Sequence, residues 1–314
     1  MANADMTNSV RAMQSPVKKP AWMNRWFSRE TLTAWVFILP SLIGFVTFYA
    51  LPAVRGLYYS FTDWDMLKDP KFVGVDNYVK ILADPQFWHS LWVTVYYVLL
   101  NIPIQTSLAV GLAVMMDRVV KSTWLRSIFI LPWLLPSVTV AMVWTWIMSP
   151  SLGLIGIAFK ALGFDAPGLL GIPSQAMPSI ALINIWQYTG NAALLVFAGL
   201  QTIPKEVYEA AAIDGADESR IFWKMTLPLL RPVLVFVLVT TIIGSFQIFD
   251  TIAVTTKGGP VDATRVVLWY IFEYAFSRFK MGYATAVSMI VFAILITATI
   301  IQMRVLRADQ SDLA

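Results

Sequence analysis

Apolar residues gather in six long runs, which polar segments separate. The runs cover about 32–53, 88–116, 125–148, 179–200, 231–254 and 283–303. Each run is long enough to cross a bilayer, because about 20 apolar residues at 1.5 Å per residue span roughly 30 Å of hydrocarbon. The pattern therefore predicts an all-α integral membrane protein with six transmembrane helices and both chain ends on one side.

The first run follows a basic segment, so a signal peptide is the alternative interpretation. A signal core has only about 7–15 apolar residues and ends at small residues. The run over 32–53 is longer and ends in Tyr49-Ala50-Leu51-Pro52, so we expect an uncleaved span. The expected organisation is a cytoplasmic tail over 1–30, a transmembrane domain over 31–305 and a cytoplasmic tail over 306–314.

Prolines and glycines predict how the runs are shaped and joined. Pro132 and Pro136 favour a kinked third span, although incidental prolines in a loosely apolar helix are the alternative. We expect loops over 55–87 and 149–178. A turn at Lys257-Gly258-Gly259-Pro260 should lead into an amphipathic helix around 265–279, which charged residues interrupt too often for it to span.

Residues 201–230, called the elbow below, form the longest polar interruption in the second half of the chain. Pro204 suits a first helical turn, where its missing N–H is no loss. Gly215 suits the end of a helix, and Asp217 can cap the next one. Pro228 should end that second helix, because its ring lacks a donor and clashes with the preceding turn. The elbow is therefore predicted to be two short helices joined at a glycine, between spans four and five.

Composition supports the membrane assignment. The chain has 314 residues, of which 58% are hydrophobic and 13% charged, and it contains no cysteine. Soluble proteins carry about 25% charged residues. Lys and Arg are more numerous in the two tails, the loop after span two and the elbow than in the other loops, which places these segments in the cytoplasm. The net charge of +4 fits basic loops beside anionic lipid.

Spans four and five contain polar side chains. They are Asn184, Gln187, Tyr188 and Asn191, then Thr241, Ser245, Gln247 and Asp250. The first four recur at i, i+3, i+4 and i+7, which is one helix face. Such groups within hydrocarbon face either a wet cavity or a partner helix, so cavity lining and helix–helix hydrogen bonding are both open. A lining of this kind suits an uncharged, hydroxyl-rich ligand. Asp250 lies near the outer end of its span and has the interface as an alternative.

Several functions are excluded by what the sequence lacks. It has no Gly-x-x-x-x-Gly-Lys-Ser/Thr phosphate loop, so ATP binding by that route is not expected. His89 is the single histidine, which is poor material for a metal site or a general base. We expect no catalytic residue, metal or cofactor in this chain. A DNA-binding helix-turn-helix is the alternative for the elbow, but its mixed charge argues against a nucleic-acid partner. Its low-bulk alanines suit protein docking instead.

The elbow sequence resembles the EAA signature of permease subunits of binding-protein-dependent ABC importers. The residues that carry this resemblance are Glu209-Ala210-Ala211, Asp214-Gly215-Ala216, Phe222 and Leu227-Pro228. Further segments resemble the carbohydrate-uptake branch, which includes the first permeases of maltose, lactose and glycerol-3-phosphate systems. These segments are Val73-Gly74-Val75-Asp76-Asn77-Tyr78, Asp84-Pro85-Gln86-Phe87-Trp88, Ala198-Gly199-Leu200-Gln201, Thr256-Lys257-Gly258-Gly259-Pro260 and Gly282-Tyr283-Ala284.

The resemblance implies a type I importer permease in a bacterial inner membrane. Its partners would be a homologous second permease, two ATPase subunits that bind ATP and Mg, and an extracytoplasmic solute-binding protein that delivers sugar. Glu209 would meet the ATPase, with Gly215 permitting the turn. The alternatives are a permease for glycerol-3-phosphate or another polyol derivative, and a stand-alone secondary transporter. An intramembrane enzyme would need His, Cys or paired carboxylates that the spans lack.

Overall fold

The computed structural model describes residues 29–120 and 122–305. The predicted C-terminal tail over 306–314 lies outside the described residues, as does the N-terminal tail except for its last two residues. The chain divides into two units, one ending at Tyr58 and one beginning at Tyr59.

The first unit is helical throughout its described part. Helix α3 (Arg29–Phe45), the π turn η1 (Val46–Ala50) and helix α4 (Leu51–Ser60, whose end enters the second unit) form one candidate span. The amide of Leu51 donates to the carbonyl of Val46, five residues back, so the turn is wide just before Pro52. A wide turn relieves the clash of a proline ring with the preceding turn. The helix continues past the predicted end at residue 53, so the loop expected from residue 55 begins later.

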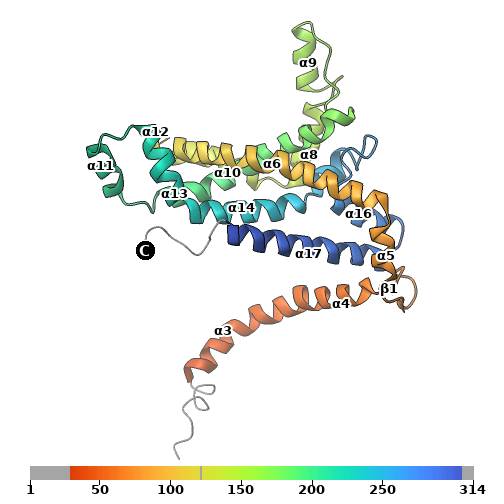
Figure 1. Ribbon diagram of the computed structural model, residues 1–314. Helices are drawn as coiled ribbons and strands as arrows, with labels where there is room; N and C mark the ends of the chain where they lie inside the picture. Colours follow the sequence, from red (N-terminus) through yellow and green to blue (C-terminus); the bar gives the residue numbers. More distant parts are fainter. Residues whose placement is uncertain (1–28, 121, 306–314) are drawn as a thin grey trace, which may run out of the picture. The chain divides into compact units, whose positions relative to one another are not determined.

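The second unit contains the remaining helices and one short hairpin (Figure 1). Its helices are α5 (Asp76–Leu82), α6 (Pro85–Arg118), α7 (Thr123–Leu134), α8 (Ser137–Ile147), α9 (Leu154–Ala161), α10 (Pro173–Leu200), α11 (Lys205–Ile213), α12 (Glu218–Ile221), η2 (Phe222–Thr226), α13 (Leu227–Leu229), α14 (Arg231–Phe246), α15 (Asp250–Thr255), α16 (Val267–Phe272), η3 (Glu273–Ser277) and α17 (Met281–Val305). Strands β1 (Thr62–Asp63) and β2 (Lys71–Phe72) pair antiparallel, with Thr62 opposite Phe72.

The described helices confirm the predicted fold class, an all-α membrane protein. Five are long and apolar enough to cross a membrane, and α7 with α8 make a sixth candidate if the bent pair is one span. The predicted loop over 149–178 is wrong in part, because α9 and the first turns of α10 lie within it. Helix α16 and the π turn η3 form the predicted non-spanning helix, over a shorter range than 265–279.

Helices α7 and α8 meet at 93°, which makes the predicted kink a sharp bend. Pro136 lies at the bend and is the N-cap of α8, with Leu135 in an extended conformation before it. Proline disfavours helical geometry in the residue before it and cannot donate a backbone hydrogen bond, so the helix ends here. The incidental-proline alternative is therefore wrong.

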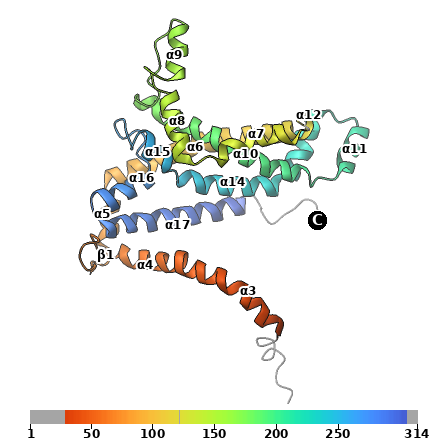
Figure 2. The same ribbon diagram turned by 180° about the vertical axis from the view of Figure 1, so that it is seen from behind.

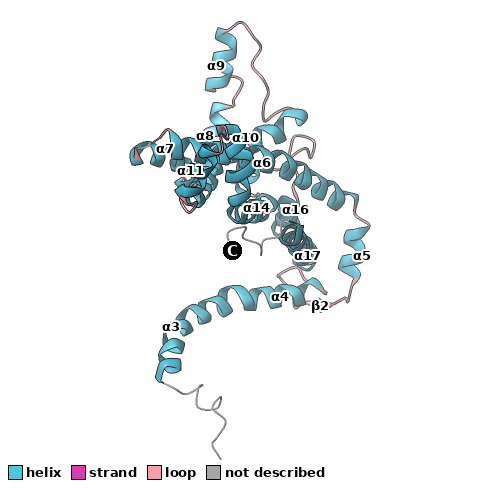
Figure 3. Cartoon of the chain, turned by 60° about the vertical axis from the view of Figure 1, so that its left-hand side comes forward, coloured by secondary structure: helices cyan, strands magenta, loops and turns pink. Residues whose placement is uncertain are grey.

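Helix α10 is the central packing element of the second unit. It packs against α6, α7 and α14, and its buried residues include Ile180, Ile183 and Val196. Figure 2 shows α7 and α14 running beside it, and in Figure 3 α14 and α17 are viewed nearly along their axes. A Cβ at Gly190 would lie 1.8 Å from the carbonyl oxygen of Phe129, so glycine permits the close approach of α10 to α7.

Three tyrosines surround the carboxylate of Asp84, and we call this group the tyrosine cage. Tyr270, Tyr274 and Tyr283 donate to Asp84 Oδ2 over 2.7, 3.3 and 3.2 Å, while Asp84 Oδ1 caps α6 by accepting from the Gln86 amide. Burial alone would raise the pKa of Asp84, but these hydrogen bonds outweigh it and hold the pKa below its ordinary value. Figure 1 places α16 and α5 at the end of this unit opposite α11 and α12.

Candidate functional site

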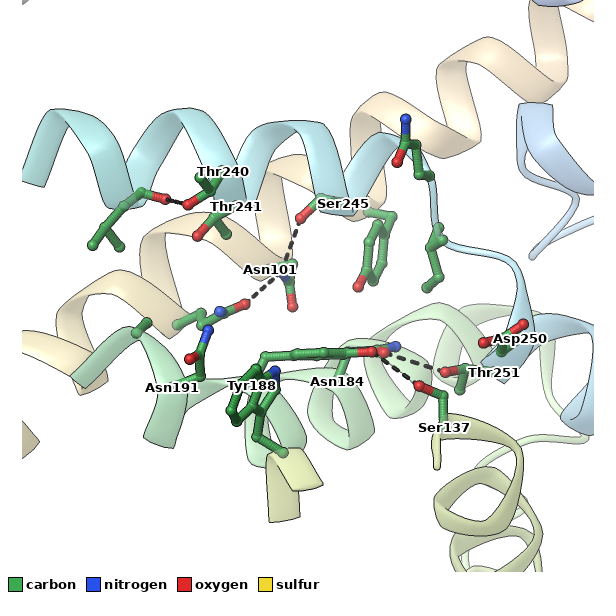
Figure 4. A pocket seen from close by; sticks show the side chains of 18 of the residues that line it. Asn101, Ser137, Asn184, Tyr188, Asn191, Thr240, Thr241, Ser245, Asp250 and Thr251 are labelled. Carbon is green, nitrogen blue, oxygen red and sulfur yellow. Dashed lines mark hydrogen bonds between the residues drawn. The ribbon is translucent and has the colours of Figure 1, made fainter. Parts of the chain in front are cut away.

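A cavity of about 350 Å³ opens among helices α6, α7, α8, α10, α14 and α15 (Figure 4). Its lining is mostly uncharged and polar, with aromatic rings from α6, α7 and α10. The polar lining residues are Tyr97, Asn101, Gln105, Ser137, Asn184, Tyr188, Asn191, Thr240, Thr241, Ser245, Gln247, Asp250 and Thr251. Amide and hydroxyl groups of this kind can exchange hydrogen bonds with a hydroxyl-rich molecule.

The structure brings most of the predicted polar set together around this cavity. The members that line it are Asn184, Tyr188, Asn191, Thr241, Ser245 and Gln247. Asp250 also lines it, at the start of α15. Two spans that are adjacent in sequence thus contribute polar faces to one space.

Gln187 departs from the predicted set. It is 1% exposed, and its Nε2 donates to the Leu135 carbonyl at 3.1 Å and to Ser137 Oγ at 3.4 Å. These partners lie at the bend between α7 and α8. Gln187 therefore satisfies a backbone group that the bend leaves without a helical partner, and for this residue the helix–helix interpretation is correct.

Asn184 and Tyr188 take part in both packing and lining. Asn184 donates to the Ile180 carbonyl at 3.0 Å and accepts from Thr251 Oγ1 at 3.2 Å, so both ends of its amide are partnered. The Tyr188 hydroxyl lies 3.0 Å from Ser137 Oγ. Figure 4 shows the Asn184–Thr251 and Tyr188–Ser137 contacts along one side of the cavity. Cavity lining and helix–helix bonding, which the sequence left as alternatives, coexist in the same side chains.

Asn101 is a lining residue that the sequence analysis did not single out. Its Nδ2 donates to Gln105 Oε1 at 2.9 Å and to Ser245 Oγ at 3.1 Å, and the side chain is buried. Its Oδ1 has no hydrogen-bond partner among the described residues. Tyr97, Asn101 and Gln105 recur at i, i+4 and i+8, so the polar-face test used for span four would have found them in span two.

The only charge that the described residues bring to the cavity lining is negative. Asp250 is the one charged residue among those that line it in the described chain, and no Lys, Arg or His is among them. The described residues also contain no group of three or more His, Cys, Asp or Glu that could hold a metal ion. Binding here would depend on hydrogen bonds to neutral groups.

The elbow has the helix–glycine–helix geometry that the sequence predicted. Gly215 has φ +74°, a left-handed conformation that favours glycine, and the Ala216 amide donates to the Ala211 carbonyl at 3.0 Å to close α11. Asp217 caps α12 by accepting from the Arg220 amide at 2.7 Å. Pro204 is the N-cap of α11, one position before the predicted first turn.

Pro228 does not end the second helix, which corrects the sequence prediction. Helix α12 passes through the π turn η2 into α13, and Pro228 lies in the first turn of α13. The Leu227 amide donates to the Phe222 carbonyl, five residues back. As at Pro52, a wide turn just before the proline gives the ring room, so the chain remains helical up to Leu229 and α14 follows at Arg231.

The surface of α11 is open in this chain. Glu209, Ala210 and Asp214 are exposed, whereas Ala211 is buried beneath them. Ile213, on the same helix, is 87% exposed. Exposed small and apolar residues of this kind suit contact with another protein.

Two polar contacts join the elbow to the end of α6. Arg118 Nη1 lies 2.7 Å from Glu218 Oε2, in an ion pair whose side chains are 37% and 87% exposed. Gln201 Nε2 donates to Asp117 Oδ1 at 2.6 Å. Helix α6, which provides Asn101 to the cavity, is therefore held at its last turn by both sides of the elbow.

A family model and individual known proteins that match this chain all point to the same family. A family model described as "Binding-protein-dependent transport system inner membrane component" matches residues 105–308. The chain is 34% identical over 279 residues to the trehalose/maltose transport system permease protein MalF of Thermococcus litoralis, covering 88% of this chain and 94% of the relative. It is 32% identical over 292 residues to the sulfoquinovosyl glycerol transport system permease protein SmoG of Agrobacterium fabrum, covering 92% and 94%.

The fold agrees with a solved transporter. The crystal structure of a bacterial ABC transporter involved in import of the acidic polysaccharide alginate superposes with a TM-score of 0.79, over 89% of this chain and 96% of that one. At 23% identity this likeness concerns the fold alone. The matched family model and the two relatives nevertheless cover most of the chain. The chain therefore belongs to the family of inner membrane components of binding-protein-dependent transport systems, the ABC importer permeases that its elbow sequence resembles.

Proposed function

We propose that this chain is the permease subunit of an ATP-driven importer that moves a sugar across the bacterial inner membrane. The observation that carries the proposal is the cavity inside the helix bundle, whose lining combines amides, hydroxyls and aromatic rings with aliphatic side chains and Asp250. Sugars present many hydroxyl groups, and such a lining can both donate to them and accept from them. Relatives named for trehalose/maltose and sulfoquinovosyl glycerol transport support a carbohydrate substrate.

The chain would act with several partners. A homologous second permease would complete the membrane pathway, an extracytoplasmic binding protein would deliver the sugar, and two ATPase subunits would bind ATP and Mg and hydrolyse ATP. This chain would itself catalyse no reaction. Both termini and the elbow would lie in the cytoplasm, as the distribution of Lys and Arg favours.

The elbow would be the segment on which the ATPase subunits act. Glu209 and Ala210 are exposed on α11, where an ATPase surface could approach the helix closely. Gly215 provides the bend between the two elbow helices, and Ala216, Asp217 and the π turn η2 continue the chain toward α14. Closure of the ATPase pair would move the elbow and switch the cavity between outward and inward access.

A phosphorylated polyol such as glycerol-3-phosphate is a second candidate substrate from the sequence. No Lys or Arg of the described residues lines the cavity, so a basic partner for a phosphate would have to come from the second permease. A stand-alone secondary transporter is disfavoured, since the chain belongs to a binding-protein-dependent family.

The proposal is tested by uptake into vesicles that contain this chain with its partner permease and ATPase. Radiolabelled sugar should accumulate only when both the binding protein and ATP are supplied. Glu209→Lys should abolish uptake while leaving membrane insertion intact, and Glu206→Ala, on the same helix but outside the signature, should transport normally. Uptake by this chain without the ATPase would refute the proposal.

A further inference from the structure

We infer that helix α9 lies in the plane of the membrane and inserts its apolar side into the outer leaflet, with Lys160 at the level of the lipid phosphates. The inference goes beyond the proposed function, because it assigns a lipid-binding surface that sugar transport does not by itself require. It takes from that proposal only the orientation in which the elbow faces the cytoplasm. The partner that it names is the lipid of the outer leaflet and not another protein.

Helix α9 lies at the end of the second unit that is remote from the elbow. It is in the segment between α8 and α10, and α10 runs from that segment to the elbow through 28 residues, about 42 Å. Figures 1, 2 and 3 all show α9 crosswise to the long helices and standing away from them. A helix crosswise to the spans lies along the membrane plane. With the elbow in the cytoplasm, that plane belongs to the outer leaflet.

Two glycines fix α9 against the chain that precedes it. A Cβ at Gly153 would lie 2.3 Å from the Trp146 carbonyl oxygen, and one at Gly156 would lie 2.4 Å from the Pro150 carbonyl oxygen. Ile155 packs against a buried cluster formed by α8, its last turn and α10. These contacts hold one side of α9, so the direction in which the helix stands is built into the fold.

The rest of α9 and its flanks exposes apolar side chains. The large ones are Leu152, Leu154, Ile157, Phe159, Leu162 and Phe164. Lys160 is the one charged residue from 150 to 164. Trp146, at the end of α8, is also exposed, and tryptophan is enriched where membrane meets water. Contiguous exposed apolar side chains of this kind mark a surface that another phase or molecule covers.

The arrangement of side chains around α9 favours lipid as that cover. At about 100° per residue, Gly156 and Lys160 lie on one side of the helix, and Leu154, Ala158 and Leu162 lie on the opposite side. One cationic side and one aliphatic side are typical of an interfacial helix, whose apolar side enters the bilayer by about 5–10 Å. Lys160 has no ion-pair partner among the described residues, so its ammonium is available to a lipid phosphate.

The two protein partners fit this surface less well. From 152 to 164, Lys160 offers the only side chain that can form hydrogen bonds, whereas the contact surface of a soluble binding protein needs several such groups. The second permease would complete the cavity, which Ser137 lines at the opposite end of α8 from α9. Lipid requires neither hydrogen-bonding side chains nor a position beside the cavity.

The test uses the transporter assembled with cysteine-free partner permease and ATPase, in vesicles of phosphatidylethanolamine and phosphatidylglycerol without the binding protein. This chain contains no cysteine, so a single introduced cysteine can carry a fluorescent label. Ala158→Cys places the label on the apolar side, and Lys160→Cys places it about 200° round the same helix. Leu67→Cys, in the exposed segment between β1 and β2, is the aqueous control. Brominated lipid and iodide are the two quenchers.

Brominated lipid should quench the Ala158→Cys label roughly threefold more than the Leu67→Cys label, and iodide should show the reverse order. Iodide should quench the Lys160→Cys label more than the Ala158→Cys label. Ala161→Cys, on the same side as Ala158, repeats the measurement if the first label disturbs insertion.

Three outcomes would overturn the inference. Equal iodide quenching at Ala158→Cys and Leu67→Cys would place α9 in water, and protection from both quenchers would place it against the second permease. Protection from iodide that appears only when the binding protein is added would identify that protein as the partner. Absence of ATP-dependent sugar uptake would refute the proposed function instead, and the quenching pattern would not depend on it.

Discussion

Arg118, the last residue of α6, forms an ion pair at 2.7 Å with Glu218, the first residue of α12. The contact joins the elbow to a helix that also provides Tyr97, Asn101 and Gln105 to the cavity. The Gln201–Asp117 hydrogen bond reinforces it from the other side of the elbow. A displacement of the elbow would therefore act on α6 directly, in addition to acting on α14 through the chain.

Reversing one charge of this pair should impair coupling more than stability. Exposed ion pairs contribute only about 0–1 kcal/mol, so Arg118→Glu or Glu218→Arg should shift the unfolding temperature little. In reconstituted transporter, each single variant should lower the amount of sugar moved per ATP hydrolysed. The double reversal restores opposite charges and should recover most of that ratio. A double variant no better than either single one would show that the pair has no role in coupling.

The conformation of Gly215 makes a second prediction. At φ +74° a β-branched residue is strained, by roughly 1–2 kcal/mol or more. Gly215→Val should therefore distort the bend between α11 and α12 and uncouple ATP hydrolysis from uptake, while the protein still inserts. Gly215→Asn is the matched control, because asparagine tolerates this conformation, and it should keep most of the uptake. Normal uptake by the valine variant would contradict the elbow mechanism.

The tyrosine cage predicts a pH dependence of stability. The pKa of Asp84 is lowered in the folded protein, so its contribution is fully present above the unfolded value of about 3.9 and is lost as pH falls through the folded pKa. Asp84→Asn should unfold at a lower temperature near neutral pH, and its deficit should shrink on acidification. Unfolding of detergent-solubilised protein, measured at several pH values between about 3 and 7, provides the test.

Controls separate the cage from a general effect of removing charge. Asp69→Asn changes an exposed carboxylate in the β1–β2 segment and should leave the pH profile unaltered. Tyr270→Phe removes the shortest of the three hydroxyl contacts to Asp84 and should cost about 1.5–3 kcal/mol at neutral pH. Equal profiles for Asp84→Asn and the unaltered protein would mean that the cage does not stabilise the fold.

Close packing of α10 against α7 gives a fourth prediction. A methyl group at Gly190 would lie 1.8 Å from the Phe129 carbonyl oxygen, so the two helices must separate in Gly190→Ala. Overpacking of this kind costs about 1–3 kcal/mol, and Tyr188 and Asn191 beside it should shift, lowering sugar affinity as well. Gly111→Ala has nothing within 4 Å of the new methyl group and should be neutral or slightly stabilising. Thermal unfolding of the two variants distinguishes them.

Much of the fold follows from the sequence because the dominant physical constraint is local. A membrane helix must form its backbone hydrogen bonds within itself, so the long apolar runs predicted the spans. The prolines at 132 and 136 predicted the bend for the same reason. The elbow was predictable for the same reason, since Gly215 and Asp217 act within a few residues. The prediction for Pro228 was wrong because a π turn before the proline gives its ring room, so the helix continues. Sequence periodicity does not distinguish a π turn from an α-helical one.

The site was harder to predict from the sequence than the fold, because it depends on contacts between helices. The spacing places Gln187 on the same helix face as Asn184. Its side chain nevertheless donates a hydrogen bond to the Leu135 carbonyl, which lies at the bend between α7 and α8. Asn101 had a readable i+4 pattern, but its hydrogen bond to Ser245, a neighbour distant in sequence, could not be predicted from spacing. Three-dimensional partners, which spacing does not reveal, decide which polar residues only pack between helices and which also line the cavity.

Helix α6 has 34 residues, which corresponds to about 51 Å at 1.5 Å per residue, against roughly 30 Å of hydrocarbon. We expect the excess length to lie in the aqueous and headgroup layers; Asp84 at one end belongs to the tyrosine cage, and Arg118 at the other end contacts the elbow. A helix longer than the bilayer normally adjusts its tilt to the local thickness. Protein contacts at both ends oppose such an adjustment here, so we expect the tilt of α6 to depend on the state of the transporter as well as on the thickness of the surrounding lipid.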